Sequence, residues 1–243
     1  MAIRKHVDYS STKGYVGYVD MGTGDISQDV LATECLTLML TAVNDSWKIP
    51  IGYFLIHGLS GKEKANLVRL ALEKTFEAGV IVISVTCDGP SSHFSMLTEL
   101  GLQLDVKTLS SGFPHPSNPS QLVYGVLDCA HMIKLVRNSF EHFGRIKDAD
   151  GNEIDWKYVK QLQELQENEG LRAGNKLKKA HIHFKQQKMK VNLATQLLSS
   201  SVANAIEFAD KDIGLPEFKG SEGKWLVVIA GSLTIIVHAL IFF

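Results

Sequence analysis

The stretch VIVISVT at residues 80–86, followed at once by CDGP at 87–90, indicates the fold class. A continuous run of β-branched residues is typical of a strand that is covered on both faces. The preceding residues predict a helix, because Ser60 and Glu63 fit a capping box and an apolar stripe follows them at helical spacing. We therefore expect an α/β domain built around a buried strand.

Further elements are predicted on both sides of this strand. Beyond residue 155 the pattern becomes entirely helical, which predicts a second domain. We place the first domain at 1–148 and the helical domain at 149–222. The predicted strands are 3–9, 15–21, 34–43, 48–56 and 122–127; the predicted helices are 92–100, 129–143, 156–168, 176–184 and 189–210; residues 110–120 are predicted to form a loop.

Composition narrows the function classes. Hydrophobic residues make up 45% of the chain and charged residues 21%, with a net charge of -1, as in an ordinary globular protein. A dedicated nucleic-acid-binding protein usually carries a basic excess, although charge can be segregated along the chain. The three cysteines form no CxxC pair, which argues against a zinc finger or a disulfide framework and favours a reducing compartment.

The C-terminal segment has a different character. Trp225 to Phe243 reads WLVVIAGSLTIIVHALIFF and contains no Asp, Glu, Lys or Arg. As a helix it would span roughly 28 Å, close to the thickness of the bilayer core. The segment predicts a transmembrane-like helix at 225–243 and a membrane as a partner. The alternative is sequence read past the end of an exon.

Two aspartates follow predicted strands directly. Asp88 comes after VIVISVTC, and Asp128 comes after LVYGVL. Functional groups gather at the carboxyl ends of strands in open α/β sheets, and paired carboxylates can hold Mg²⁺ or Mn²⁺ for phosphoryl transfer. An aspartate before a helix is also a common N-cap. We favour the N-cap interpretation for Asp128 and the metal interpretation for Asp88.

Basic residues cluster at two places after the predicted strand at 122–127. A polar stripe on the helix 129–143 faces either a phosphate or solvent, and residues 176–190 hold six lysines that contact phosphate or form a solvated helix face. His181 and His183 lie two residues apart, which places them on different faces of a helix and argues against a metal site. The candidate phosphate or nucleic-acid contacts are Lys134, Arg137, Lys178 and Lys179.

Three strings resemble one family. The strings WKIPIGYFLIHGLSGKEKANLV (47–68) and VISVTCDGPSSHFSMLTELG (82–101) resemble the RNase H-like domain of P-element/THAP-type DNA transposases. The string YGVLDCAHMIKLVRNSF (124–140) resembles that family's Asp-x-x-His-x-x-Lys-x-x-Arg-Asn segment. The helical stretch that follows, including LSSSVANAIEF (198–208), resembles the start of its GTP-binding insertion domain.

The resemblance implies a partial RNase H-like mixed sheet with flanking helices, followed by a helical insertion-domain fragment. It implies cut-and-paste DNA transposition in the nucleus, with Mg²⁺ or Mn²⁺ and GTP as cofactors, DNA as a partner and self-association of transposase chains. The family holds two divalent cations with an Asp-Asp-Glu set, and Asp88 matches the second acid by position. Asp88 is therefore the implied catalytic and metal-binding residue.

This sequence departs from the family at both ends. The family's first Asp precedes the position of Met1, and its Glu follows the whole insertion domain, so we expect a truncated chain. One carboxylate cannot clamp two metals, and we expect no transposase activity from this chain alone. The enzyme class stays open. The alternatives are a non-catalytic nucleotide- or DNA-binding module, which the lysines favour, and a tail-anchored membrane protein.

Overall fold

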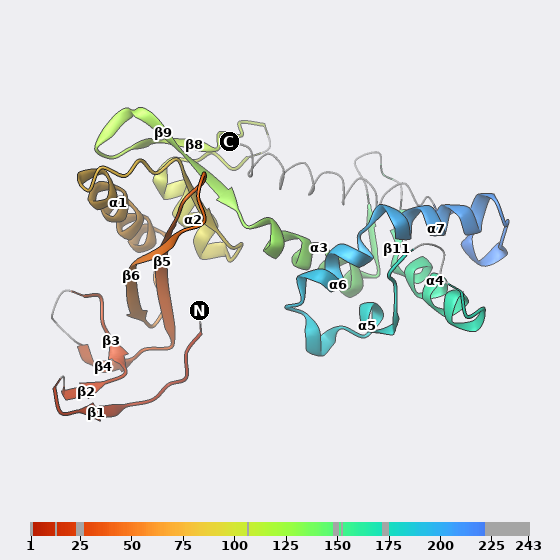
Figure 1. Cartoon of the computed structure of the whole chain (residues 1–243), viewed down its shortest axis with the longest axis horizontal. Coiled ribbons are helices and arrows are strands. Elements are labelled where there is room, and N and C mark those ends of the chain that lie inside the picture. Colours follow the sequence, from red (N-terminus) through yellow and green to blue (C-terminus); the bar gives the residue numbers. More distant parts are fainter. Residues whose placement is uncertain are drawn as a thin grey trace. The chain divides into compact units, whose positions relative to one another are not determined.

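The computed structural model divides the chain into two compact units, Met1–Leu127 (unit 1) and Asp128–Phe243 (unit 2). Unit 1 is a set of small sheets with helices, and unit 2 is mostly helical (Figure 1). The domain limits predicted at 148/149 and at 222 stay predictions. The structure describes residues 2–12, 14–22, 27–105, 107–147, 151, 153–171 and 175–221.

The first half of unit 1 consists of three antiparallel hairpins. The longest pairs β5 with β6, from Glu34 opposite Ile56 to Thr41 opposite Lys48, and it has a register shift between Leu38 and Met39. The predicted strands at 34–43 and 48–56 are confirmed in this hairpin. The three pairs are β1 (Asp8–Ser10) with β2 (Gly14–Val16), β3 (Tyr18–Val19) with β4 (Ser27–Leu31), and β5 (Glu34–Thr41) with β6 (Lys48–Ile56).

The second half of unit 1 packs two helices against a mixed sheet of order β7-β9-β8. Strand β7 (Ser84–Cys87) runs parallel to β9 (Asn118–Leu127), and β8 (Gly112–His115) pairs with β9 in the antiparallel sense. Helices α1 (Gly61–Glu77) and α2 (Ser91–Leu100) bury their apolar sides there. The core residues are Ala65, Val68, Leu72, Met96, Leu97, Leu100, Leu102, Phe113 and Val123.

Helix caps fall where the sequence predicts them. The Ser60 hydroxyl accepts from the Glu63 backbone N–H, and the Glu63 carboxylate accepts from the Ser60 N–H, so the capping box is confirmed. The Ser60 hydroxyl also donates to the Glu63 carboxylate, and this bond, together with the one from the Ser60 N–H, lowers the pKa of Glu63. Helix α3 (Cys129–Phe143) begins at Asp128, whose Oδ1 accepts from the Ala130 N–H at 3.0 Å. The N-cap interpretation of Asp128 is therefore confirmed.

Two parts of unit 1 differ from the prediction. Strand β8 lies inside the predicted loop at 110–120, because Phe113 and His115 are buried alternately and β9 supplies their backbone partners. The predicted strand at 80–86 starts only at Ser84, and Ile81 is 67% exposed. The expected cover on both faces is missing around Ile81.

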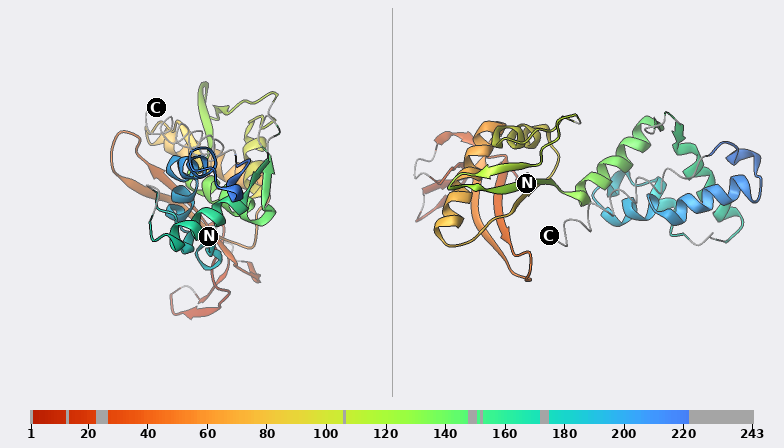
Figure 2. Two further views of the ribbon diagram at one scale, coloured as in Figure 1. Left: turned by 90° about the vertical axis from the view of Figure 1, so that its right-hand side faces the viewer. Right: turned by 90° about the horizontal axis from the view of Figure 1, so that it is seen from above.

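Unit 2 buries one apolar core between its helices. The indole of Trp156 lies edge-on to Phe140, with ring centroids 5.1 Å apart, and 6.4 Å from Phe184. The helices, coloured green to blue, gather together in both views (Figure 2). The elements are α3, β10 (Arg145–Lys147), β11 (Glu153–Asp155), α4 (Trp156–Asn168), α5 (Lys179–Ile182), η1 (Lys185–Gln187), α6 (Val191–Leu197), α7 (Ser200–Lys211) and η2 (Pro216–Phe218).

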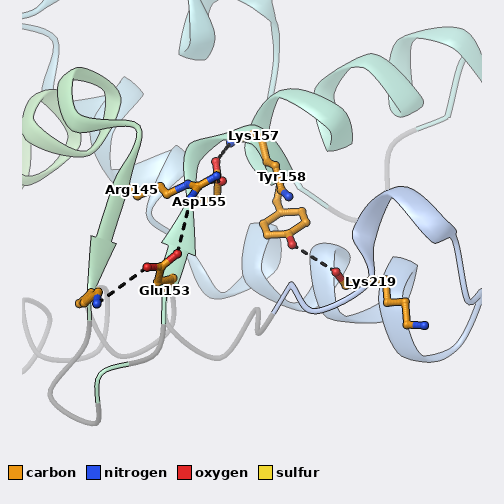
Figure 3. A network of polar contacts seen from close by, with 7 residues as sticks. Arg145, Glu153, Asp155, Lys157, Tyr158 and Lys219 are labelled. Atoms are coloured by element: carbon orange, nitrogen blue, oxygen red, sulfur yellow. Dashed lines mark hydrogen bonds and ion pairs between the residues drawn. The ribbon is translucent and has the colours of Figure 1, made fainter.

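A polar network joins the β10–β11 hairpin to α4 (Figure 3). Arg145 Nε donates to Asp155 Oδ2 at 3.0 Å, while Asp155 Oδ1 accepts from the Lys157 backbone N–H at 2.8 Å. One carboxylate therefore both pairs across the hairpin and caps the helix. The Tyr158 hydroxyl donates to the Lys219 carbonyl at 3.2 Å, which fastens the last described turn to α4.

The helices of unit 2 are more broken than predicted. The predicted helix at 176–184 shortens to α5, because the Asn175 and His181 side chains accept backbone N–H groups of Leu177 and Lys178. Such local bonds compete with the helix. The predicted helix at 189–210 is divided into α6 and α7 at Leu198–Ser199, where Ser199 is the N-cap residue of α7.

The predicted fold class is wrong in one respect, the transmembrane-like helix. Within the described ranges, no helix is long and apolar enough to cross a membrane. The longest of these, α1, has 17 residues and carries charged side chains along its length, whereas a spanning helix needs about 20 mainly apolar residues. The predicted segment Trp225–Phe243 lies outside the described residues. The mixed α/β architecture itself agrees with the prediction.

Candidate functional site

Asp88 lies at the carboxyl end of β7, one turn before α2. Its side chain is 47% exposed, and its Oδ1 is 2.7 Å from Nδ1 of His93, a residue of α2 whose side chain is 17% exposed. The same Nδ1 is 3.2 Å from the Asp88 carbonyl oxygen. With a proton on Nδ1, the ring donates to both oxygens and holds the carboxylate at the sheet edge.

Further polar groups surround this aspartate. Lys64 is only 7% exposed, and its Nζ donates to the Ser92 hydroxyl at 2.8 Å. The pKa of the Cys87 thiol is raised to about 11, first by burial and then by the Asp88 carboxylate, while Lys64 acts in the opposite direction. We call Lys64, Cys87, Asp88, Ser92 and His93 the β7 cluster. It combines a buried cation, a protonated thiol and a half-exposed carboxylate.

The β7 cluster contains residues that sequence reasoning missed. His93 and Ser92 lie on the first turn of α2, within reach of an aspartate that ends the preceding strand. Lys64 shares one helix face with the buried residues Ala65, Val68 and Leu72. The sequence does contain a signal for this cluster, namely that Lys64 falls on the apolar stripe of a helix. A buried lysine needs a polar partner, so its position indicates polar groups nearby.

The described residues fit one ligand of a divalent cation and do not fit a two-metal centre. Asp88 offers a carboxylate of the type that Mg²⁺ and Mn²⁺ prefer, with Oδ1 already engaged by His93. Nowhere in the described part of the chain do three or more His, Cys, Asp or Glu residues gather to hold a metal ion. The catalytic and metal-binding role of Asp88 therefore stays a prediction.

Arg137, a predicted phosphate contact, is fully buried in unit 2. Its Nη2 donates to the Lys188 carbonyl at 2.6 Å, and its Nη1 donates to the Lys190 carbonyl at 3.3 Å. The guanidinium carbon lies 4.0 Å from the ring centroid of Phe184, and burial lowers the pKa of Arg137. These contacts fasten the segment around η1 to α3, which is a structural role.

The predicted lysine contacts differ in their surroundings. Lys134 lies on α3 and is almost buried. Lys178 is exposed, whereas the Nζ of Lys179 forms an ion pair with Glu167 Oε1 at 2.6 Å. The carboxylate partly offsets the charge of Lys179. All six lysines at 176–190 are exposed: Lys176, Lys178, Lys179, Lys185, Lys188 and Lys190.

His181 belongs to this lysine-rich segment but is only 2% exposed. Its Nδ1 accepts from the Lys178 backbone N–H at 3.0 Å, and its Nε2 lies 3.0 Å from Gln196 Oε1. These partners assign the proton to Nε2. Burial lowers the pKa of His181, although the bonds to Gln196 and Lys178 act in the opposite direction. The ring is a neutral part of the core.

Known families match both halves of the chain. Residues 1–101 match the family described as TNP-like, RNase H N-terminal domain. Residues 130–227 match the family described as TNP-like, GTP-binding insertion domain. The second match begins close to the boundary between the two units.

Two curated proteins, both transposases, are similar in sequence to this chain. Human DNA transposase THAP9 is 33% identical over 215 residues, covering 88% of this chain and 24% of that protein. The Transposable element P transposase of Drosophila melanogaster is 27% identical over 169 residues, covering 69% of this chain and 21% of that protein. The chain spans about a quarter of the length of these relatives.

A solved structure supports the fold. The chain superposes on the Drosophila P element transposase strand transfer complex with a TM-score of 0.77, over 95% of this chain and 47% of that one. The sequence identity is 21%, so the likeness shows the fold alone. The family matches, the relatives and the fold agree, and the chain belongs to the P-element/THAP-type transposase family, of which it carries the RNase H N-terminal domain and the GTP-binding insertion domain.

Proposed function

We propose that this chain is a transposase-derived segment that contributes to metal-dependent cleavage and strand transfer of DNA in cut-and-paste transposition. Asp88 supplies one metal-binding carboxylate, and the chain does not cleave DNA alone. One observation carries the proposal: a half-exposed carboxylate stands at the carboxyl end of β7, with no group of three or more potential ligands around it in the described residues. A two-metal reaction needs several such oxygens.

His93 acts as the positioning residue of this carboxylate. Its bond to Oδ1 fixes one oxygen of Asp88 and leaves Oδ2 without a partner among the residues that the structure describes. A carboxylate held by one oxygen presents the other at a defined place, as ligating carboxylates do in metal sites. The buried Lys64 keeps positive charge beside the same strand end, where its Nζ donates to the Ser92 hydroxyl.

A nuclease assay tests the proposal. The purified chain is incubated with supercoiled plasmid carrying terminal-repeat DNA, in Mg²⁺ and in Mn²⁺. We expect no nicking above that of the Asp88→Asn variant, and Asp45→Asn, an exposed aspartate in the β5–β6 turn, is the matched control. Metal-dependent cleavage that Asp88→Asn abolishes and Asp45→Asn leaves intact would contradict the inactivity of the chain.

The lysine-rich segment favours a second candidate function, binding of GTP or DNA without cleavage. Six exposed lysines occur within residues 176–190, and only Lys179 forms an ion pair with a described carboxylate. Exposed lysines that lack a carboxylate attract phosphates through charge, so binding weakens steeply with salt. We propose Lys178 and Lys179 as phosphate contacts, while burial makes Arg137 a poor candidate.

Equilibrium binding separates the two candidates. Fluorescent GTP and labelled duplex DNA are titrated with the full chain at two salt concentrations. A phosphate site predicts weaker binding for Lys178→Ala, with Lys160→Ala on the exposed side of α4 as the control. Equal affinity of both variants, or binding without salt dependence, would remove the phosphate role of this segment. For either function we propose action in the nucleus, where the DNA lies.

A further inference from the structure

The first turn of α2 is held by contacts from outside that helix. Its N-cap residue is Pro90, and no side chain caps the backbone N–H groups of this turn. Two neighbouring side chains of the turn are bonded to other elements instead. The Ser92 hydroxyl accepts from Lys64 Nζ of α1 at 2.8 Å, and His93 Nδ1 lies 2.7 Å from the carboxylate of Asp88. The turn therefore connects α1 to the end of β7.

Lys64 is buried although its partner is neutral. The residue is 7% exposed and lies on the same face of α1 as Ala65 and Val68. Among the residues that the structure describes, the Ser92 hydroxyl is the only hydrogen-bond partner of Lys64 Nζ. A buried ammonium group is costly, and an apolar side chain would fill this face at lower cost. Stability alone therefore does not explain the lysine, and its bond to α2 favours a role in geometry.

Gly61, one turn earlier in α1, allows the two helices to approach closely. It is buried, and a Cβ at this position would stand 2.8 Å from the backbone nitrogen of Met96 and closer still to the Ser95 side chain. Any other residue would push α2 away from α1. Gly61 and Lys64 are three residues apart on one face of α1, and Ser95 and Ser92 are three residues apart in α2. The two pairs fix the place of α2 against α1.

We propose that Lys64 and Gly61 are positioning residues for the Asp88 carboxylate, and that they act through the first turn of α2. This inference rests on the proposed function, in which Asp88 supplies one metal-binding carboxylate. Lys64 holds Ser92 of that turn. The next residue, His93, holds Oδ1 of Asp88. A shift of α2 against α1 displaces the carboxylate through these bonds, and the outer partners of ligating carboxylates strengthen metal binding.

Mn²⁺ binding to the full chain, followed by electron paramagnetic resonance, tests this inference. Lys64→Met keeps the length of the side chain but removes the donor and its charge. That charge reaches the strand end, where it opposes the rise in the pKa of Cys87 that burial and Asp88 cause. Loss of the charge alone would strengthen cation binding, whereas loss of the positioning bond weakens it. We expect a Kd at least about threefold higher for Lys64→Met, and no change for Lys62→Met at an exposed site of the same turn.

Ser92→Ala removes the other end of the same bond. It should raise the Kd by a similar factor, and the double variant Lys64→Met/Ser92→Ala should bind no more weakly than either single variant. Gly61→Ala should weaken Mn²⁺ binding as well, because the added methyl group displaces α2. Effects of Lys64→Met and Ser92→Ala that multiply in the double variant would overturn the inference.

A second readout needs no metal. The ring signals of His93, recorded by NMR at one fixed pH, report its bond to Asp88. We expect Lys64→Met and Ser92→Ala to shift these signals and Lys62→Met to leave them in place. If Lys64→Met unfolds the chain, Ser92→Ala decides the matter by both readouts.

Asp88→Asn separates this inference from the proposed function. Unchanged Mn²⁺ binding in Asp88→Asn would remove the metal role of Asp88, and the positioning role with it. If Asp88→Asn weakens Mn²⁺ binding while Lys64→Met leaves it equal or makes it tighter, the positioning inference alone is overturned.

Discussion

Unit 1 and unit 2 have apolar cores of different sizes. Among the described residues, the main cluster of unit 2 contains seventeen buried apolar side chains, and that of unit 1 contains nine. Unit 1 leaves apolar residues of α1 and of 80–86 lining a cavity of about 750 Å³, whereas unit 2 buries even Arg137 and His181 within its packing. Helices satisfy their own backbone groups, while a strand depends on neighbours for its hydrogen bonds. We therefore expect unit 2 to be the more stable half.

Removing the buried guanidinium of Arg137 should reduce the stability difference between the two units more than the other substitutions below. Arg137→Ala leaves the Lys188 and Lys190 carbonyls without their donor and removes the contact with Phe184. We expect unit 2 to lose about 4 kcal/mol of stability. Amide exchange of α3 and α6 during urea titration measures the loss.

The matched control for this substitution is an exposed arginine of the same unit. Arg145→Ala removes surface ion pairs with Glu153 and Asp155 and should cost about 0.5 kcal/mol. Similar losses for the two variants would contradict the structural role of Arg137.

Matched leucine truncations compare the two cores directly. Leu197→Ala in the core of unit 2 should cost about 3 kcal/mol, because the fully buried leucine is surrounded by packed neighbours. Leu72→Ala should cost only about 2 kcal/mol, because this residue lines the cavity of about 750 Å³ beside α1. Urea midpoints of the two units, resolved by amide exchange, give both values. The reverse order would contradict the comparison.

Acidification should destabilise unit 2 through His181. Burial lowers the pKa of this ring in the folded state, so the unfolded chain binds the proton more readily. Stability is then fully present above the unfolded pKa of about 6.5 and falls as the pH drops below it. We expect lower urea midpoints at about pH 5.5 than at about pH 7.5. His181→Gln should flatten this dependence, and His183→Gln, at an exposed site, should preserve it.

The smallest expected effect is on the reactivity of the Cys87 thiol in the β7 cluster. The pKa of Cys87 is raised to about 11, so little thiolate is present near neutral pH. Alkylation of Cys87 by iodoacetamide should be at least about tenfold slower than that of a free thiol of ordinary pKa. Peptide mapping by mass spectrometry measures the rate at each cysteine. Fast labelling of Cys87 in the folded chain would contradict the burial of its thiol.

Local signals predicted the elements whose ends are set by neighbouring residues. The Ser60–Glu63 capping box and the Asp128 N-cap fix the starts of α1 and α3, because their hydrogen bonds lie within four residues. The break between α6 and α7 at Ser199 and the strand β8 depend on tertiary packing, which single-sequence periodicity does not record. The same limit explains why Asp88 was found and His93 was missed: their pairing needs the turn between β7 and α2.

The central claim is that Asp88 stands as one carboxylate in an incomplete metal centre. Mn²⁺ binding to the full chain, followed by electron paramagnetic resonance, tests it without relying on activity. We expect weak binding, with a Kd of roughly 1 mM or more, that Asp88→Asn weakens further and Asp45→Asn does not change. Two Mn²⁺ ions bound per chain at micromolar concentration, and lost in Asp88→Asn, would contradict the account.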